Sequence, residues 1–273
     1  MMLLTELEHF IREDIGFYDY PEIVPGMEAK AKIIANETGI IAGLKEGIQI
    51  FRYFNIDVSL NISDGDEIKK GDIVCIINGS AGNILRAERL VLNFLSRMSG
   101  IATLTAECVN LAKLKNKKVR VACTRKTTPG FRKYEKKAVW IGGGDSHRFN
   151  LSDSIIIKDN HIKLIGLEQA IKSAKKASFT KKIEIEVESI DDAVKAAELG
   201  VDIIMFDNMD PEKIKKGINI LEKKGLRDKV IIEASGGITP DNITEYAKTG
   251  VDVISIGSLT TSAKWLDLSL EII

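Results

Sequence analysis

The sequence predicts an α/β protein in which a small N-terminal α/β domain precedes a TIM-like (β/α) barrel. From about residue 117 onward, six short runs rich in Val and Ile alternate with helical stretches. Continuous apolar runs of this length are typical of strands that are buried on both faces of a parallel sheet. Each run ends in polar or glycine-containing residues. This favours a barrel, because a doubly wound sheet would concentrate such residues at one switch point.

The six predicted strands share one pattern, and two of them belong to a repeat. The segments AELGVDIIMFD and AKTGVDVISIG each contain the end of a helix, a glycine turn and a strand. A standard (β/α) barrel has more strands than six, so the sequence leaves the closure of the barrel open. The runs are VRVAC before Thr124, SIIIKDN from Ser154, IEIEVES from Ile183, DIIMFDN from Asp202, VIIEASGG from Val230 and DVISIGS from Asp252.

The N-terminal region follows a different pattern. Residues 57–82 alternate apolar and polar side chains around Asp-Gly and Lys-Gly turns, which predicts antiparallel strands. Residues 84–98 predict an amphipathic helix. We expect an N-terminal domain at 1–103, a barrel at 104–262, and residues 263–273 packed back on the N-terminal domain. The predicted helix buries Ile84, Ala87, Val91, Phe94 and Met98, and its other face carries Arg86, Arg89, Asn93 and Arg97.

The composition argues against several classes of protein. The 273 residues include 39 Lys plus Arg and 39 Asp plus Glu, so the formal net charge is zero. A nucleic-acid binder would show a basic excess interleaved with aromatic residues, and the sequence shows neither. The three cysteines lack CxxC spacing, so neither a disulfide framework nor a zinc site is expected. With no signal-peptide pattern and no apolar run long enough for a membrane span, we expect a cytoplasmic protein.

The densest functional signal is the basic stretch TRKTTPGFRKYEKKAVWIGGGDSHR at 124–148. Arg125 and Lys126 directly follow a predicted strand, and the combination of Arg and Lys suits a ligand with several anionic groups. The later lysines, Lys133, Lys136 and Lys137, fit a solvated basic helix equally well. Two of the three histidines also lie in this part of the chain. His147 stands beside Arg148 and a glycine triplet, which indicates function, whereas His161 fits helix capping or packing equally well.

Acidic and glycine-rich strand ends complete the candidate site. Glu186 interrupts one apolar strand and Asp207 ends the next, and each needs a cation or hydroxyl groups as a partner, unless both form internal salt bridges. Glu184 and Glu188 share the strand parity of Glu186, so the pattern alone does not decide which of the three reaches the site. The last two strands end in Ser235-Gly236-Gly237 and Gly257-Ser258, where backbone N–H groups can approach a phosphate.

Taken together, these stretches resemble the quinolinate phosphoribosyltransferase family, also called nicotinate-nucleotide pyrophosphorylase (carboxylating). The resemblance implies an N-terminal α/β domain and a barrel of six to seven strands. It also implies a pentosyltransferase of NAD biosynthesis that converts quinolinate and phosphoribosyl pyrophosphate, with Mg²⁺ and no organic cofactor, to nicotinate mononucleotide, pyrophosphate and carbon dioxide. The matching segments are AERLVLNFLSRMSGIAT, TRKTTPGFR, GGGDSHR, IIIKDNHI, EIEVES, FDN, EASGGIT and ISIGSLT, in order from residue 87 to 260.

The resemblance also assigns roles to single residues. Arg125, His147 and Arg148 are expected to hold the quinolinate carboxylates, with Thr124 also in contact with substrate. Lys126, Lys158, Glu186 and Asp207 form the expected catalytic group, in which the two lysines contact substrate anions and the two acids bind ribose hydroxyls and Mg²⁺. Ser235, Gly236, Gly237, Gly257 and Ser258 are expected to bind the 5′-phosphate. Arg89 is expected to reach the site of a second subunit, which implies a homodimer or a larger assembly of dimers.

Two departures from the family pattern keep other interpretations open. Thr261 stands where the family has a histidine, and residues 17–26 differ from the family's N-terminal motif. The alternative is a related phosphoribosyltransferase, such as the molybdenum-associated paralogue, with another anionic ring substrate. From a different class, DGDEIKKGDIV resembles the hairpin of lipoyl or biotinyl carrier domains, but the modifiable lysine turn of those domains is missing.

Overall fold

The computed structural model describes residues 2–16 and 23–273, so the first part of the divergent segment 17–26 lies outside the described residues. Contacts divide the chain into two compact units. The first contains the residues before Thr105 together with Trp140–Gly142 and Ala263–Ile273, and the second contains Thr105–Val139 and Gly143–Ser262. Within the described part of the chain, no helix is both long and apolar enough to span a membrane.

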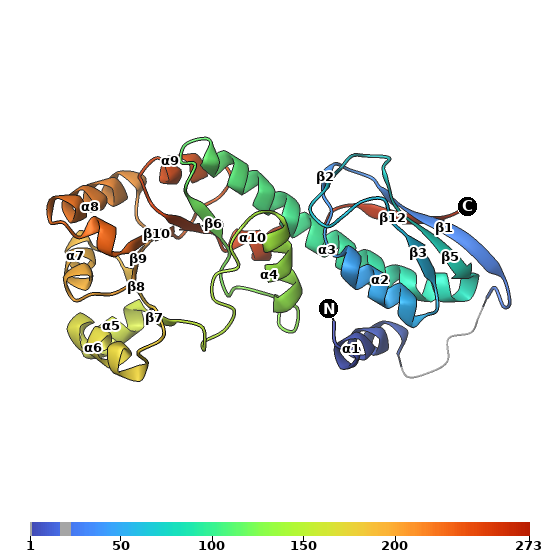
Figure 1. Cartoon of the computed structure of the whole chain (residues 1–273), viewed down its shortest axis with the longest axis horizontal. Helices are drawn as coiled ribbons and strands as arrows, with labels where there is room; N and C mark the ends of the chain where they lie inside the picture. Colours follow the sequence, from blue (N-terminus) through green and yellow to red (C-terminus); the bar gives the residue numbers. More distant parts are fainter. Residues whose placement is uncertain (1, 17–22) are drawn as a thin grey trace. The chain divides into compact units, whose positions relative to one another are not determined.

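The first unit is built on a four-stranded antiparallel sheet (Figure 1). Antiparallel strands were predicted for this region. The strand order is β12-β1-β5-β3, and a second small sheet pairs β2 with β4. Helices of this unit also pack against each other, since the rings of Phe10 and Phe94 meet edge to face with their centroids 5.0 Å apart. The elements are α1 (Leu4–Ile15), β1 (Glu28–Ala35), β2 (Gly39–Ile40), α2 (Leu44–Tyr53), β3 (Asp57–Ser59), β4 (Glu67–Ile68), β5 (Ile73–Ser80) and β12 (Leu268–Ile272).

The helix predicted at 84–98 is much longer than expected, because α3 extends over Ala81–Lys113. All five residues of the predicted apolar face are buried. The predicted helix ended at residue 98, before Ser99 and Gly100, whereas α3 continues through both. In the structure Gly100 lets the backbone at Lys264 approach the helix closely, since a Cβ at residue 100 would overlap the Lys264 carbonyl oxygen. Buried residues such as Ile101 and Cys108 then continue the apolar face.

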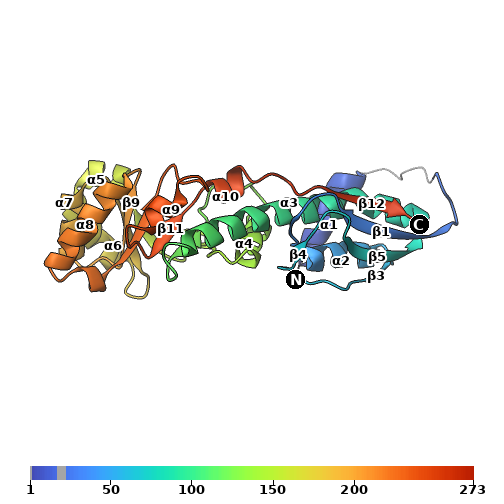
Figure 2. The same cartoon turned by 90° about the horizontal axis from the view of Figure 1, so that it is seen from above.

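The second unit contains the six predicted strands in one parallel sheet, with the order β6-β11-β10-β9-β8-β7 (Figures 1 and 2). A parallel bridge between Ala122 and Asp145 adds a further strand position beside β6. Among the described residues no ladder joins β7 to β6, so hydrogen bonds leave the barrel open there. The strands are β6 (Arg120–Ala122), β7 (Ile155–Ile157), β8 (Ile183–Val187), β9 (Ile203–Asp207), β10 (Ile231–Ser235) and β11 (Val253–Ser255).

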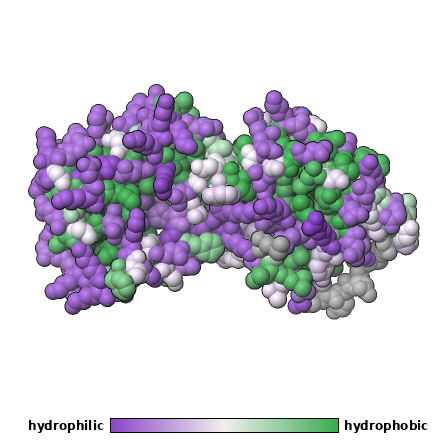
Figure 3. Space-filling model, in the orientation of Figure 1, coloured by the Kyte–Doolittle hydropathy of each residue, from purple (hydrophilic) through white to green (hydrophobic). Residues whose placement is uncertain are grey.

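Helices alternate with these strands and lie outside the sheet (Figure 1). In the face drawn in Figure 3, hydrophilic residues cover much of this unit, whereas hydrophobic residues gather over the strands of the first unit. The helices are α4 (Arg132–Ile141), α5 (Asp159–Ile165), α6 (Leu167–Ala177), α7 (Ile190–Glu198), α8 (Pro211–Lys223), α9 (Ile243–Ala247) and α10 (Ser258–Thr261).

The sequence repeat corresponds to a structural repeat. Gly200 and Gly250 both have positive φ, +72° and +92°, which ends the preceding segment in a left-handed turn. Two residues later, Asp202 accepts a hydrogen bond from the Ile183 N–H at 2.7 Å, and Asp252 accepts one from the Ile232 N–H at 2.7 Å. In each repeat, the aspartate before the strand therefore binds the start of the neighbouring strand. This contact fixes the register of the two strands, and so the positions at which their carboxyl ends lie.

Candidate active site

A cavity of about 500 Å³ lies in the second unit, at the carboxyl ends of the parallel strands. A cavity of this size and position is typical of substrate sites in barrels of this kind. The cavity is lined by Cys123, Thr124, Arg125 and Lys126 after β6; His147 and Arg148 after the Asp145 bridge; Ile156, Lys158 and Asp159 around the end of β7; Glu186 of β8 and Glu188 just after it; Met205 and Asp207 of β9; Glu233 and Ser235 of β10; and Ser255 of β11.

Most of the residues predicted from the sequence meet in this cavity. Those that line it are Thr124, Arg125, Lys126, His147, Arg148, Lys158, Glu186, Asp207 and Ser235. Gly236, Gly237, Gly257 and Ser258 follow directly after β10 and β11 but do not line the cavity themselves. Gly257 lies close to it, since a Cβ there would be 3.3 Å from Lys126 Cδ. Arg89 is separate: it is an exposed residue of α3 and lines a different cavity, in the first unit, with Asp14 and Arg86.

At the mouth of the cavity, Lys158 and Glu186 form an ion pair, which we call the mouth pair. Lys158 Nζ lies 2.6 Å from Glu186 Oε1, and the side chains are 48% and 15% exposed. Arg125 supplies a second feature, because its Nε atom is buried and has no hydrogen-bond partner in the described part of the chain. A buried guanidinium nitrogen without a partner is costly unless a ligand satisfies it. The mouth is therefore prepared to receive an anion.

Asn208 connects the ends of two strands beside the mouth. Its backbone lies in the left-handed region, with φ +52°, and its N–H donates to the Ser235 carbonyl at 2.9 Å. Its side-chain amide donates to Asp207 Oδ2 at 3.0 Å. Gly236 has φ +97° and lies so close that a Cβ would overlap Asn208. Only glycine fits at this position, which explains the glycine in the Ser235-Gly236-Gly237 loop.

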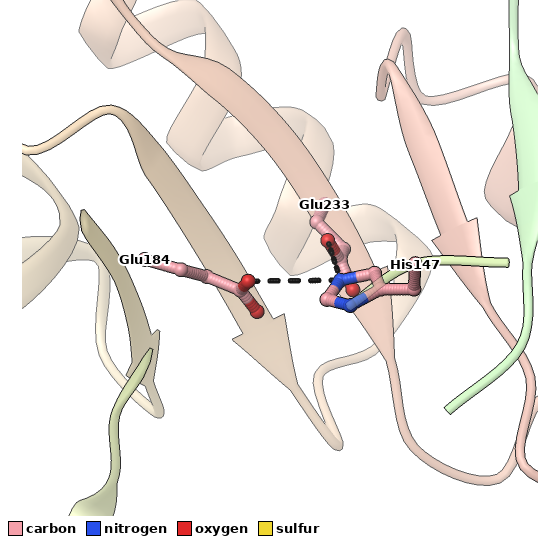
Figure 4. Close-up of side chains that lie close together, drawn as sticks. All are labelled: His147, Glu184 and Glu233. Atoms are coloured by element: carbon pink, nitrogen blue, oxygen red, sulfur yellow. Dashed lines mark hydrogen bonds and ion pairs between the residues drawn. The ribbon is translucent and has the colours of Figure 1, made fainter. Parts of the chain in front are cut away.

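His147 and Glu233, which line the cavity, and Glu184, which does not, form what we call the buried cluster (Figure 4). The three side chains are 15%, 1% and 2% exposed. Burial and the neighbouring Glu233 carboxylate raise the pKa of Glu184 to about 8. Burial opposes the charge of His147, but the hydrogen bond and charge of Glu233, together with Glu184, outweigh it and raise the pKa of the imidazole.

The segment that carries His147 is held from two sides. His147 has a backbone φ of +51°, an unusual conformation for a residue other than glycine, and its N–H donates to Asp145 Oδ1 at 2.7 Å. Lys136 of α4 donates to the Ser146 carbonyl and lies 3.5 Å from Cys123 Sγ. The solvated-helix interpretation is therefore wrong for Lys136, which is 3% exposed, and burial lowers its pKa.

The structure also resolves two ambiguities that the sequence left open. His161 Nδ1 accepts the Lys158 N–H at 2.9 Å, so this histidine caps the start of α5. Of the three glutamates in and directly after β8, Glu186 and Glu188 line the cavity and Glu184 lies in the buried cluster. Sequence reasoning missed Glu233. The available signal was its position in VIIEAS, where it interrupts an apolar strand just as Glu186 does in IEIEVE.

Comparisons with known proteins agree with this geometry. The profile described as "Quinolinate phosphoribosyl transferase, C-terminal domain" matches residues 101–271, and its N-terminal counterpart matches residues 14–99. A protein of Methanothermobacter thermautotrophicus named nicotinate-nucleotide pyrophosphorylase (carboxylating) is 49% identical over 99% of both chains. The human protein of that name is 38% identical, over 99% of this chain and 91% of the human one.

Solved structures lead to the same family. The crystal structure of nicotinate-nucleotide pyrophosphorylase from Ehrlichia chaffeensis is 32% identical and superimposes with a TM-score of 0.93, covering 100% of this chain and 99% of that one. The Streptococcus pyogenes structure titled NadC is 40% identical, with a TM-score of 0.90, and covers 98% and 96% of the two chains. The chain therefore belongs to the quinolinate phosphoribosyltransferase family.

Proposed function

We propose that this protein is a carboxylating nicotinate-nucleotide pyrophosphorylase. It transfers the phosphoribosyl group of phosphoribosyl pyrophosphate to the ring nitrogen of quinolinate and releases pyrophosphate and carbon dioxide, leaving nicotinate mononucleotide. The observation that carries the proposal is one cavity in which the cations Arg125, Lys126, Arg148 and Lys158 meet the carboxylates of Glu186 and Asp207. Such a site suits a substrate pair that is rich in anionic groups and carries ribose hydroxyls.

The two carboxylates of quinolinate bind to Arg125, Arg148 and His147 in this proposal. Arg125 and Arg148 offer planar donors that match carboxylate geometry, and the unpartnered Arg125 Nε is satisfied when substrate binds. Thr124 adds a hydroxyl beside Arg125. Lys126 and Lys158 both line the cavity and serve as point charges for the remaining substrate anions.

Glu186 and Asp207 act at the reacting carbon. Departure of pyrophosphate from ribose C1′ creates an oxocarbenium-like centre, and fixed carboxylates stabilise positive charge there. Glu186 and Asp207 also fit a Mg²⁺ ion that is shared with the substrate, because this ion is usually bound by one or two carboxylates together with substrate oxygens. When bound, Mg²⁺ neutralises the leaving pyrophosphate. Glu186 would exchange its contact with Lys158 Nζ for contacts with the ion and the ribose.

The 5′-phosphate is assigned to the loops after β10 and β11. Ser235, Gly236 and Gly237 form the first loop, and Gly257 and Ser258 form the second. The two strands are neighbours in register, with Ser235 opposite Ser255. The two loops therefore start side by side, and backbone N–H groups without bulky side chains can approach one phosphate group.

Decarboxylation then needs no organic cofactor. Once the ring nitrogen is bonded to C1′, it carries positive charge beside the ring carbon that loses carbon dioxide. That carbon keeps the electron pair of the broken bond, which the adjacent positive nitrogen stabilises, and then takes up a proton. The protein has to exclude water from the reacting atoms and hold the departing carboxylate in place.

Arg89 is assigned to the active site of a second copy, so the working form is a homodimer or an assembly of dimers. Support comes from its position on α3, where it is exposed and lines a cavity with Asp14 and Arg86. Burial raises the pKa of Asp14, while the charge of Arg89 opposes this change. Arg89→Ala should then weaken quinolinate binding, and mixing this variant with Arg125→Ala subunits should restore part of the activity by forming one complete site per dimer.

The function is tested by incubating the protein with quinolinate, phosphoribosyl pyrophosphate and Mg²⁺ while carbon dioxide and nicotinate mononucleotide are measured. We expect both products in equal amounts, and none after a chelator removes the metal. Nicotinate in place of quinolinate distinguishes a non-carboxylating relative, because it would give the mononucleotide without carbon dioxide. Absence of both products with quinolinate, in the presence of Mg²⁺ and folded protein, would refute the assignment.

A further inference from the structure

His147 lines the substrate cavity, but its ring contacts two carboxylates behind it. Nε2 lies 3.3 Å from Glu233 Oε2 and 3.6 Å from Glu184 Oε2, and both dashed lines in Figure 4 end on this one nitrogen. Within residues 2–16 and 23–273, the other ring nitrogen, Nδ1, has no hydrogen-bond partner. The ring is therefore held at one nitrogen and available at the other.

The charges around the ring determine what Nδ1 can do. A neutral imidazole has one N–H, so a ring that donates from Nε2 to Glu233 can donate from Nδ1 only when it is protonated. Glu233 on β10 and Glu184 on β8 favour the protonated ring, and Lys136 on α4 opposes it. Burial opposes the protonated ring most strongly, but the two glutamates outweigh burial and Lys136 together and raise the pKa of the ring. In the protonated ring Nδ1 is an N–H donor, and its natural partner is an anionic oxygen of the substrate.

We propose that Glu233 and Glu184 are positioning residues that hold His147 as a protonated ring, so that Nδ1–H donates to one carboxylate of the ring acid. Glu233 acts through its hydrogen bond to Nε2, and Glu184 through its contact with the same nitrogen at 3.6 Å. That the bound ring acid is quinolinate rests on the proposed function, but the geometry of the three side chains does not depend on it. Glu184 differs from a catalytic residue because it does not line the cavity.

Other features of the structure show that this placement of the ring is built in. Both oxygens of Glu184 and Oε1 of Glu233 are buried without a hydrogen-bond partner in the described residues. Such groups are costly, and they persist where function requires them. The left-handed backbone of His147 adds a further cost, which Asp145 offsets by accepting the His147 N–H. The buried carboxylate oxygens and the left-handed backbone both oppose folding, yet together they hold the His147 ring against Glu184 and Glu233.

A divalent cation is the alternative occupant, because the three ligand atoms lie within 4.8 Å of one another. Their separations of 3.3 and 3.6 Å are also near those between ligands of a tetrahedral zinc ion. The charge balance favours the first interpretation. A protonated His147 and Arg148, whose charge acts on Glu184, already place positive charge beside the two acids. A dication would add excess positive charge next to Arg148 and Lys136.

Histidine NMR tests the proposal directly, since the chain has only His9, His147 and His161. Ring-labelled protein shows three signals, and His147→Gln assigns the one of interest. We expect a protonated ring at neutral pH in the wild type. Glu233→Gln should lower the titration midpoint of His147 by about one pH unit, and Glu184→Gln should lower it by less. Glu222→Gln, an exposed glutamate of α8, should leave the midpoint unchanged.

Kinetics supply the second readout. Glu233→Gln should raise the KM for quinolinate about tenfold and leave the KM for phosphoribosyl pyrophosphate unchanged, because only the contact with the ring acid is weakened. In the His147→Gln background, Glu233→Gln should have no further effect on that KM. A general structural role would instead raise both KM values and add to the effect of His147→Gln.

Two results would overturn the proposal: a His147 midpoint that is unchanged in both glutamine variants, or tight binding of Zn²⁺ or Mn²⁺ to the wild type that Glu184→Gln abolishes. If Glu233→Gln does not fold, Glu184→Gln and the wild-type spectrum still decide between these outcomes. Failure of the proposed function is distinguishable, because the NMR titration needs no turnover. An unchanged midpoint in a protein that converts quinolinate would refute this inference alone.

Discussion

The mouth pair and the buried cluster both join a cation to a carboxylate, but water reaches them to different degrees. The side chains of Lys158 and Glu186 are 48% and 15% exposed, whereas those of His147 and Glu233 are 15% and 2% exposed. An exposed pair contributes little to stability and can exchange partners, while a buried pair that loses one member leaves a costly charge behind. The mouth pair is therefore suited to open for substrate, and the buried cluster is suited to fix the position of the His147 ring.

The difference in depth follows from the geometry of one strand. Glu184 and Glu186 point to the same side of β8, and two residues of a strand span about 7 Å. Glu186 therefore reaches the mouth, and Glu184 lies one level deeper, beside Glu233 on β10. The same spacing on β10 separates Glu233 from Ser235, which lines the cavity nearer to the strand end. The barrel thus stacks a substrate layer on a supporting layer.

The largest effect is expected at the mouth. Arg125→Ala should abolish turnover, a loss of about a thousandfold or more, because the side chain supplies a buried donor that only substrate satisfies. The circular dichroism spectrum and the thermal midpoint should remain close to those of the wild type. Turnover at the wild-type rate would remove Arg125 from the mechanism, and loss of the folded state would show that its role is structural.

The second prediction separates activity from stability in the mouth pair. Glu186→Gln should lower kcat about a hundredfold, since a fixed charge at the reacting centre is lost. The free energy of unfolding should change by less than about 1 kcal/mol, because water screens the partly exposed pair with Lys158. Glu188→Gln is the matched control, as Glu188 lines the same cavity and is exposed, and a smaller loss of kcat is expected there. A drop in stability of several kcal/mol in Glu186→Gln would contradict the comparison.

Burial should also control the chemistry of the thiols. Desolvation raises the pKa of Cys75 and of Cys108 to about 12, from an ordinary value near 9. Native protein at pH 8 should therefore react with a thiol reagent far more slowly than unfolded protein. The sign of the linkage follows: above pH 9 the unfolded thiols lose protons that the folded ones keep, so stability falls as pH rises. Rapid labelling of two native thiols would show that these side chains are accessible.

The smallest effect is expected at Thr261, the position at which the family resemblance of the sequence implies a histidine. Thr261 is exposed, and its hydroxyl contacts the Gly257 carbonyl at 3.2 Å within the short helix α10. Because the position is open to water, Thr261→His should fold normally and keep turnover within about threefold of the wild type. Steady-state kinetics measure this. A collapse of activity would mean that the loop after β11 differs from its family counterpart around the phosphate.

The sequence predicted the parts of this structure that depend on local pattern. The apolar runs placed all six parallel strands, and the residues at the ends of those strands, such as Arg125 and Asp207, do meet in one cavity. Period-two alternation showed that Glu184, Glu186 and Glu188 face the same side, but not which of them reach the cavity, since that depends on the neighbouring strands. The partners of His147 were also beyond reach, because Glu233 lies 86 residues away in sequence.

Lys136 is a second residue whose contacts could not be predicted from local pattern. In the sequence it is one of several lysines on a basic helix, yet in the structure it is buried against Cys123 and the segment that carries His147. The length of α3 was also misjudged: the helix was predicted at 84–98 but continues past Gly100, where the segment at Lys264 approaches closely. Each miss involves a contact between residues that are distant in the chain.

Calorimetric titration of the protein with quinolinate and with nicotinate tests the central claim most directly. A site in which Arg125, Arg148 and His147 hold two carboxylates should bind quinolinate and lose at least about a hundredfold in affinity for nicotinate, which lacks one of them. Equal affinity for the two acids would contradict a site built around a dicarboxylate.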